Sequence, residues 1–474
     1  MANKLSIFVQ KYSIEVSLSI ILIIGISLRF YGLTVQSYWV DELFTLFTAN
    51  PNATLAEAIH RVFHDLVHPP VYNVLLWVWF ELFGFTEYVG RSFSAFTGSL
   101  SIIAIYYLGK ETFNKNVGIY AALIVSLNYF LIYYSQDVRS YSIFVLWTIL
   151  SYLFLFKAIR TQSTYNIVLY ILFTLLLIYT HYFAFFLVGS QFFVFLYYIA
   201  ISTTNRKKLI YTAVAPMIVI ALSIAPLLYN ILSSDATIAA ERMAWCKEPT
   251  PYFFLSYIKE YFSYQSVLFG ILLLILAVKI YQKKIKNSHI IYALIIWIVI
   301  SFLLPYIKSM ISYPILTDRY TIYVLPAMIL LISVAIDSIE NKKLKYIILA
   351  FIIFFSVFRL YRYDYYSKPV KEEWRKVTNY VIADSENFPI YTPYYYQGHT
   401  EHFNTYFEIL KSKKRALSLA QLTKELDSGN APSHFWIIEA HGKNLLSTPL
   451  INKYSLIKVE EIKGIQSIGV LFKQ

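Results

Sequence analysis

The sequence has a single cysteine, Cys246, among its 474 residues. One thiol excludes an internal disulfide and any zinc site built from several cysteines. Glycine and proline are scarce, with 14 and 15 residues, which excludes fibrous and disordered classes. Charged residues are also few, at 15% of the chain, whereas 58% of the residues are hydrophobic and 18% are aromatic. Soluble domains carry about 25% charged residues, so this composition indicates a protein of the lipid bilayer.

The sequence also lacks a glycine-rich phosphate loop, a zinc-protease motif and a nucleophile elbow. An ATP-driven machine is therefore not expected, and the energy for any reaction has to arrive with the substrate. The net charge is +13, from 41 Lys and Arg against 28 Asp and Glu. In a membrane protein such an excess is first explained by basic cytoplasmic loops, and we do not expect nucleic acid as a partner.

Long apolar runs predict eleven transmembrane helices, because a helix needs about 20 apolar residues to cross the hydrocarbon. The predicted spans are 13–31, 92–109, 117–134, 141–159, 165–181, 182–201, 209–230, 261–280, 288–307, 319–337 and 345–362. The run 71–85 is shorter and contains Glu81, so we interpret it as a helix that lies at the membrane interface.

Basic clusters orient these spans. If the N-terminus, with Lys4 and Lys11, lies in the cytoplasm, every basic cluster between spans falls on the cytoplasmic side. The clusters lie at 110–115, 157–160, 206–208, 283–286 and 342–345. Counting 71–85 as a span would place them outside. The sequence therefore predicts a multi-pass protein of the plasma membrane with a cytoplasmic N-terminus and an extracytoplasmic C-terminus.

After residue 362 the long apolar runs give way to short ones separated by polar residues. The segments 435–438 and 468–472 are rich in the aromatic and β-branched residues typical of strands, and 373–383 is predicted to be a helix. The predicted fold is an all-α polytopic membrane module over 1–362, with a large first outer loop at 32–91. A small extracytoplasmic α/β domain over 363–474 follows it.

Polar residues that could carry chemistry gather in the predicted outer loops. Asp41 and Glu42 directly follow Trp39-Val40 in the first loop. If the loop buries them, one carboxylate could act as a general base. A solvated pair, in which Asp41 caps an interfacial helix, explains the same residues.

Two arginines on the same side are candidates for binding an anion. Arg139 lies in a short turn between two spans, and its planar fork suits phosphate oxygens or a carboxylate. An ion pair from Arg139 to Asp41 or Glu42 that locks two helices is equally compatible with the sequence. Arg319 is the second candidate, and a snorkelling arginine at the interface is its alternative.

The order and sidedness of these motifs resemble the GT-C membrane glycosyltransferases, above all the branch with protein O-mannosyltransferases and lipid A aminoarabinose transferases. The resemblance covers about 30–380 and rests on six motifs, which are Trp39 to Glu42, His68 to Tyr72, Gln136 to Tyr141, Thr180 to Phe183, Arg319-Tyr320 and Glu373 to Arg375. Aminoarabinose transferases have a lysine where this chain has His68, so the sugar need not be aminoarabinose.

The resemblance implies a sugar on a polyprenyl phosphate (dolichyl or undecaprenyl) that is transferred outside the cytoplasm to an acceptor glycan, lipid or protein. It implies Asp41 as the catalytic carboxylate, in inverting style, with Glu42 beside it. The predicted substrate-binding residues are His68, Tyr72, Gln136, Arg139, Tyr141, His181, Arg319 and Tyr320. No cofactor is certain, and a divalent metal held by Asp41 and His68 stays open.

The chemistry of the residues agrees with that implication. A carrier phosphate is already a leaving group, so transfer needs a base at Asp41 and cations such as Arg139 and Arg319 for the departing phosphate. A secondary transporter, the main alternative, predicts ionisable residues in the middle of spans, where this sequence has almost none. A membrane scaffold with an outer binding domain would leave the Asp41–Glu42 loop without a purpose.

Overall fold

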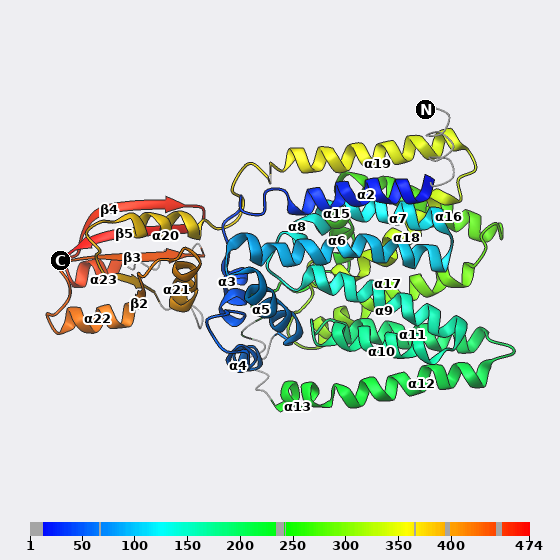
Figure 1. The fold of residues 1–474 in the computed structure, drawn as a ribbon, viewed down its shortest axis with the longest axis horizontal. Helices are drawn as coiled ribbons and strands as arrows, with labels where there is room; N and C mark the ends of the chain where they lie inside the picture. Colours follow the sequence, from blue (N-terminus) through cyan, green and yellow to red (C-terminus); the bar gives the residue numbers. More distant parts are fainter. Residues whose placement is uncertain are drawn as a thin grey trace.

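The computed structural model describes residues 13–65, 68–233, 241, 243–364, 366–393, 399–441 and 448–474. Lys4 and Lys11, which the orientation argument uses, lie outside these residues. A long helical bundle and a smaller unit with a β-sheet lie end to end, as Figure 1 shows. The chain passes from the bundle into the sheet unit once, after α19.

A helix occupies each of the eleven ranges predicted to span the membrane. The bundle helices are α2 (Ser13–Phe30), α6 (Glu87–Thr112), α7 (Lys115–Leu127), α8 (Tyr129–Ser135), α9 (Tyr141–Thr161), α10 (Thr164–Ile178), α11 (Ala184–Ile201), α12 (Arg206–Ser223), α13 (Ala225–Ser233), α15 (Phe253–Phe262), α16 (Ser266–Tyr281), α17 (Ser288–Ile311), α18 (Leu325–Asp337) and α19 (Lys342–Arg362). Short 3₁₀ turns, η1 (Ser263–Gln265) and η2 (Ile322–Val324), precede α16 and α18.

Within the described residues, six helices are long and apolar enough to cross a membrane, or seven if the bent pair α7 and α8 forms one span. Eleven spans therefore stay a prediction. The range 117–134, predicted as one straight span, bends by 61° between α7 and α8. Asn128 lies at the break, where its side chain accepts a hydrogen bond from Leu131 N as the N-cap of α8 and donates one to Tyr261 O.

The first outer loop folds into three helices, α3 (Val40–Thr48), α4 (Leu55–Asp65) and α5 (Val71–Phe83). Figure 1 shows them at the end of the bundle that faces the sheet unit. Helix α5 corresponds to the predicted interfacial helix at 71–85. Its first residue, Val71, donates a backbone hydrogen bond of 2.9 Å to Tyr179 O at the end of α10, which fastens the loop to the bundle.

The C-terminal unit is a mixed five-stranded sheet in the order β2-β1-β3-β5-β4. Its strands are β1 (Ile390–Thr392), β2 (Ala416–Ser418), β3 (His434–Ala440), β4 (Ile457–Gly464) and β5 (Ser467–Lys473). Its helices are α20 (Trp374–Ala383), α21 (His399–Ile409), α22 (Leu419–Asp427) and α23 (Thr448–Lys453). The predicted strands at 435–438 and 468–472 lie in β3 and β5, which pair antiparallel, and the predicted helix at 373–383 is α20.

The core beneath the C-terminal unit is continuous with the core of the first outer loop. Trp374 in α20 and Tyr406 in α21 belong to the same buried apolar cluster as Tyr38 and Leu43 beside α3. Because burial of apolar surface stabilises a contact in proportion to its area, this shared cluster holds the sheet unit against the loop that contains Asp41.

Candidate active site

Asp41 lies in the first turn of α3, and its carboxylate is paired with an arginine from a distant part of the chain. Arg319 Nη1 lies 3.2 Å from Asp41 Oδ2. The side chains of Arg319 and Asp41 retain 18% and 27% of their exposure, so a substrate can reach both. Asp318 accepts a hydrogen bond from the backbone N–H of Arg319, whereas the guanidinium of Arg319 bonds Asp41.

Aromatic rings surround the Arg319 guanidinium. It lies 4.7 Å from the ring centroid of Trp245, 5.6 Å from that of Trp39 and 5.4 Å from that of Tyr320. Such cation–π contacts favour a cation without neutralising it. The site therefore keeps a positive charge that can be offered to an anion.

Arg139 approaches Asp41 from the other side and is almost completely buried. Its Nη1 donates to the backbone oxygen of Asp41 at 3.1 Å and to Thr45 Oγ1 at 3.0 Å, and its Nη2 lies 2.8 Å from His68 Nε2. Burial would lower the pKa of Arg139, but the charge of Asp41 raises it above its ordinary value. Arg139 thus stays charged and holds the start of α3 against His68.

His68, Tyr72 and Arg139 line one small cavity, together with Thr45 and Thr180. The structure therefore brings together three of the residues predicted to bind substrate. The Tyr72 hydroxyl is buried and lies 3.4 Å from Ser94 Oγ.

Beside Arg319, the aromatic rings of Tyr141, His181 and Tyr320 pack against one another. The ring centroid of His181 lies 6.1 Å from that of Tyr141 and 5.3 Å from that of Tyr320. Tyr141 is fully buried, and its hydroxyl has no hydrogen-bond partner within the described residues. Its substrate-binding role stays a prediction, as do those of His181 and Tyr320.

Gln136 has a different environment from the other predicted residues. Its Nε2 donates to Leu28 O, Arg29 O and Tyr31 O at 3.2, 3.0 and 2.8 Å. These are carbonyl groups at the C-terminal end of α2, which otherwise have no partner in the helix. Gln136 therefore caps α2, and the contact with substrate predicted for it stays a prediction.

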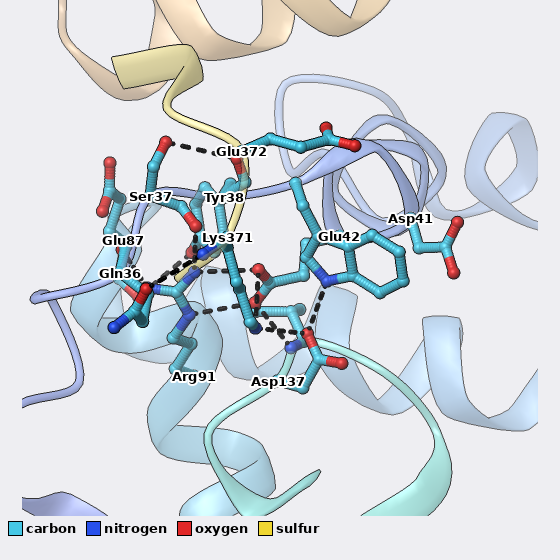
Figure 2. Close-up of polar contacts among 12 residues, drawn as sticks. Gln36, Ser37, Tyr38, Asp41, Glu42, Glu87, Arg91, Asp137, Lys371 and Glu372 are labelled. Atoms are coloured by element: carbon cyan, nitrogen blue, oxygen red, sulfur yellow. Dashed lines mark hydrogen bonds and ion pairs between the residues drawn. The ribbon is translucent and has the colours of Figure 1, made fainter. Parts of the chain in front are cut away.

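Glu42 points away from Asp41 into a buried ionic network (Figure 2). Its carboxylate accepts hydrogen bonds from Arg91 at 2.9 and 2.8 Å and from Val138 N at 2.9 Å, and Lys371 Nζ lies 3.3 Å from it. Burial would raise the pKa of Glu42, but Arg91 and Lys371 hold it below its ordinary value. Its complete enclosure argues for a positioning role in place of the predicted catalytic one.

Asp137 shares Lys371 with Glu42. Its Oδ1 accepts from Lys371 Nζ at 3.0 Å and from Trp39 Nε1 at 2.9 Å. Burial raises the pKa of Asp137, and the negative charge of Glu42 adds to that effect. The network fixes the residues on both sides of Asp41, since Trp39 precedes Asp41 and Glu42 follows it.

Sequence reasoning did not identify Arg91 and Lys371 as members of the site. Arg91 directly precedes the predicted span 92–109, and a charge so close to a span needs a buried partner, which is a signal that could have been used. Lys371 lies more than 300 residues from Glu42 in the sequence, and no local pattern connects the two.

A metal held by Asp41 and His68 stays an open prediction. The described part of the chain contains no group of three or more His, Cys, Asp and Glu side chains that could hold an ion. His68 Nε2 is also occupied by Arg139.

Comparison with known proteins identifies the fold that contains this site. A family model described as dolichyl-phosphate-mannose-protein mannosyltransferase matches residues 67–229. No curated protein matches the chain in sequence. The crystal structure of apo ArnT from Cupriavidus metallidurans is 10% identical and matches with a TM-score of 0.65 over 98% of each chain. The chain has the GT-C fold.

Other structures with this fold contain lipid carriers. ArnT bound to undecaprenyl phosphate is 12% identical and matches with a TM-score of 0.60 over 96% of this chain and 97% of that one. Archaeoglobus fulgidus AglB, an oligosaccharyltransferase in complex with an inhibitory peptide and a dolichol-phosphate, has a TM-score of 0.58 at 12% identity. That match covers 98% of this chain and 74% of AglB. The resemblance seen in the motifs is confirmed for the fold, which is that of a multi-pass membrane protein.

Proposed function

We propose that the protein is an integral membrane glycosyltransferase that moves a sugar from a polyprenyl phosphate to a hydroxyl group of an extracytoplasmic acceptor. The observation that carries the proposal is Asp41 in a GT-C fold, where Arg319 bonds its carboxylate and Arg139 bonds its backbone oxygen. The family model for dolichyl-phosphate-mannose-protein mannosyltransferase and the undecaprenyl phosphate bound to ArnT support the lipid-linked donor.

In this proposal Asp41 is the base. It accepts the proton of the acceptor hydroxyl while that oxygen attacks the anomeric carbon of the sugar. The bond between the anomeric carbon and the phosphate oxygen breaks, and its electron pair stays on the phosphate. The polyprenyl phosphate leaves, so no nucleotide is needed. Interactions that strengthen as this charge develops lower the barrier most.

The two arginines have different roles in this scheme. Arg319 is partly exposed, and Asp41 is the only described carboxylate that it bonds. Arg319 can therefore release Asp41 and bind the carrier phosphate in its place. That exchange would also free the carboxylate to act as a base. Arg139 is buried and tied to Thr45, His68 and the backbone of Asp41, so it orients α3 and the cavity.

We also propose that this site and the sheet unit lie outside the cytoplasm. The basic clusters at 110–115, 157–160, 206–208, 283–286 and 342–345 support a cytoplasmic location for the opposite loops. In Figure 1 the sheet unit and the first-loop helices α3 to α5 lie at the same end of the bundle.

Transfer by the purified full chain in lipid nanodiscs tests the function. We expect release of polyprenyl phosphate from a polyprenyl-phosphate hexose, measured by mass spectrometry with candidate glycan, lipid and peptide acceptors. A panel of polyprenyl-phosphate hexoses and pentoses that gives neither transfer nor hydrolysis would contradict the proposal.

A further inference from the structure

Glu372 is a buried carboxylate in the segment that connects the bundle to the sheet unit. Its Oε2 accepts hydrogen bonds from Val40 N at 3.2 Å and from Trp374 Nε1 at 2.6 Å. Its Oε1 lies 2.7 Å from His441 Nδ1. One side chain therefore contacts the first outer loop, the start of α20 and the end of strand β3.

The contact with Val40 lies at the start of α3, one residue before Asp41. Trp39 occupies the N-cap position of this helix and makes no side-chain capping bond. The free N–H groups of a first helical turn need an acceptor and favour a negative charge. Glu372, which lies more than 300 residues further along the chain, supplies both the acceptor and the negative charge.

His441 connects Glu372 to the sheet. It directly follows β3 and has a positive backbone φ of 75°, which is uncommon for a non-glycine residue. The hydrogen bond to Glu372 raises the pKa of His441, and the nearby charge of Asp41 adds to this effect.

The connecting segment and the start of α20 are each fastened at a further point. Arg375 Nη1 donates to Thr34 O and to Glu87 Oε2, both at 2.8 Å, and Lys371 bonds Glu42 and Asp137. Figure 2 shows Lys371 and Glu372 next to the stretch from Gln36 to Glu42. The rigid attachment of this segment gives Glu372 a fixed position from which to hold α3.

We propose that Glu372 is a positioning residue for Asp41 and that His441 of the sheet unit orients Glu372. The sheet unit is then a structural part of the transfer site, because its contacts set the direction of the first turn of α3. This inference rests on the proposed role of Asp41 as base. It assigns no contact with substrate to Glu372.

The test compares Glu372→Ala, Glu372→Gln and His441→Gln with Glu373→Gln. Glu373 is a matched control, because it is the adjacent carboxylate and its side chain bonds Ile465 N at the sheet edge. Two properties are measured on the full chain in nanodiscs. One is hydrogen exchange of a peptide that spans Val40 to Thr48. The other is kcat and KM for hydrolysis or transfer of a polyprenyl-phosphate hexose.

Glu372→Ala is expected to increase exchange at the start of α3 and to lower kcat by about ten- to a hundredfold, since small misplacements of a catalytic group have effects of that size. The donor KM should stay within about twofold, because Arg319 is untouched. Glu372→Gln, which keeps one acceptor oxygen, should recover part of the rate. His441→Gln should lie between Glu372→Gln and the wild type, and Glu373→Gln should match the wild type.

Unchanged exchange in Glu372→Ala would overturn the inference, and so would faster exchange with an unchanged kcat. Equal losses in Glu372→Ala and Glu373→Gln would point to general destabilisation and would also overturn it. If the wild-type protein transfers and hydrolyses nothing, the proposed function fails. The exchange measurement then still decides whether Glu372 holds α3.

Discussion

At the scale of single residues, the site is built around two adjacent carboxylates in opposite environments. Asp41 is partly exposed and faces Arg319, whereas Glu42 is enclosed by Arg91 and Lys371. Neighbouring residues on a helix point in different directions, so one carboxylate can meet substrate while the other fixes the helix.

The two arginines should therefore respond differently to truncation. Arg319→Ala is expected to weaken binding of a short-chain polyprenyl-phosphate sugar by about ten- to a hundredfold, because a charge-assisted bond contributes about 1.5–3 kcal/mol. Arg139→Ala should lower turnover even at saturating donor, because Arg139 holds the backbone of Asp41. Donor titration with both variants measures this, and unchanged donor affinity in Arg319→Ala would remove the phosphate contact from the scheme.

Glu42 should matter for stability. Glu42→Gln leaves the buried charge of Arg91 without its carboxylate and Lys371 with Asp137 alone, and loss of one partner of a buried pair costs roughly 3–5 kcal/mol. We expect Glu42→Gln to have a clearly lower melting temperature in detergent. The control Glu386→Gln, on the exposed surface of the sheet unit, should leave the melting temperature unchanged. Because the pKa of Glu42 is lowered, its stabilisation is present above the ordinary glutamate pKa and is lost as the pH falls below it. An unchanged melting temperature for Glu42→Gln would contradict the description of the network.

At the scale of helices and strands, the sequence was informative where one physical signal dominated. Apolar runs predicted the positions of the bundle helices, and aromatic and β-branched runs predicted β3 and β5. The bend at Asn128 was missed, because the apolar pattern continues across it and one of the bonds that Asn128 makes there is to Tyr261, far along the chain. The short strands β1 and β2 have three residues each, too few for a pattern.

The site was predictable in part for a similar reason. Polar residues beyond the ends of spans stand out against an apolar sequence, which led to the prediction of Asp41, His68, Arg139 and Arg319 as site residues. Glu372 and Lys371 lie in a polar segment where such residues are common, and only the fold brings them to α3. Contacts over several hundred residues have no local signature.

At the scale of the whole molecule, the placement of the bundle in the membrane is directly testable. If the basic clusters set the orientation, a reporter that is active only in the cytoplasm should be inactive when it is fused after Lys368. The same reporter placed in the loop at 283–286, with its basic cluster, should be active. Activity of the fusion after Lys368 would reverse the topology and place Asp41 on the cytoplasmic side.

The most direct test of the central claim is the rate of sugar transfer by Asp41→Asn. The substitution keeps the shape of the side chain but removes its basic oxygen, and general base catalysis contributes about a hundred- to ten-thousandfold to a rate. We predict a loss of that size with unchanged melting temperature and membrane insertion, while Asp427→Asn, on the exposed surface of the sheet unit, keeps the wild-type rate. Near-normal transfer by Asp41→Asn at matched expression would contradict the role of Asp41 as the catalytic base.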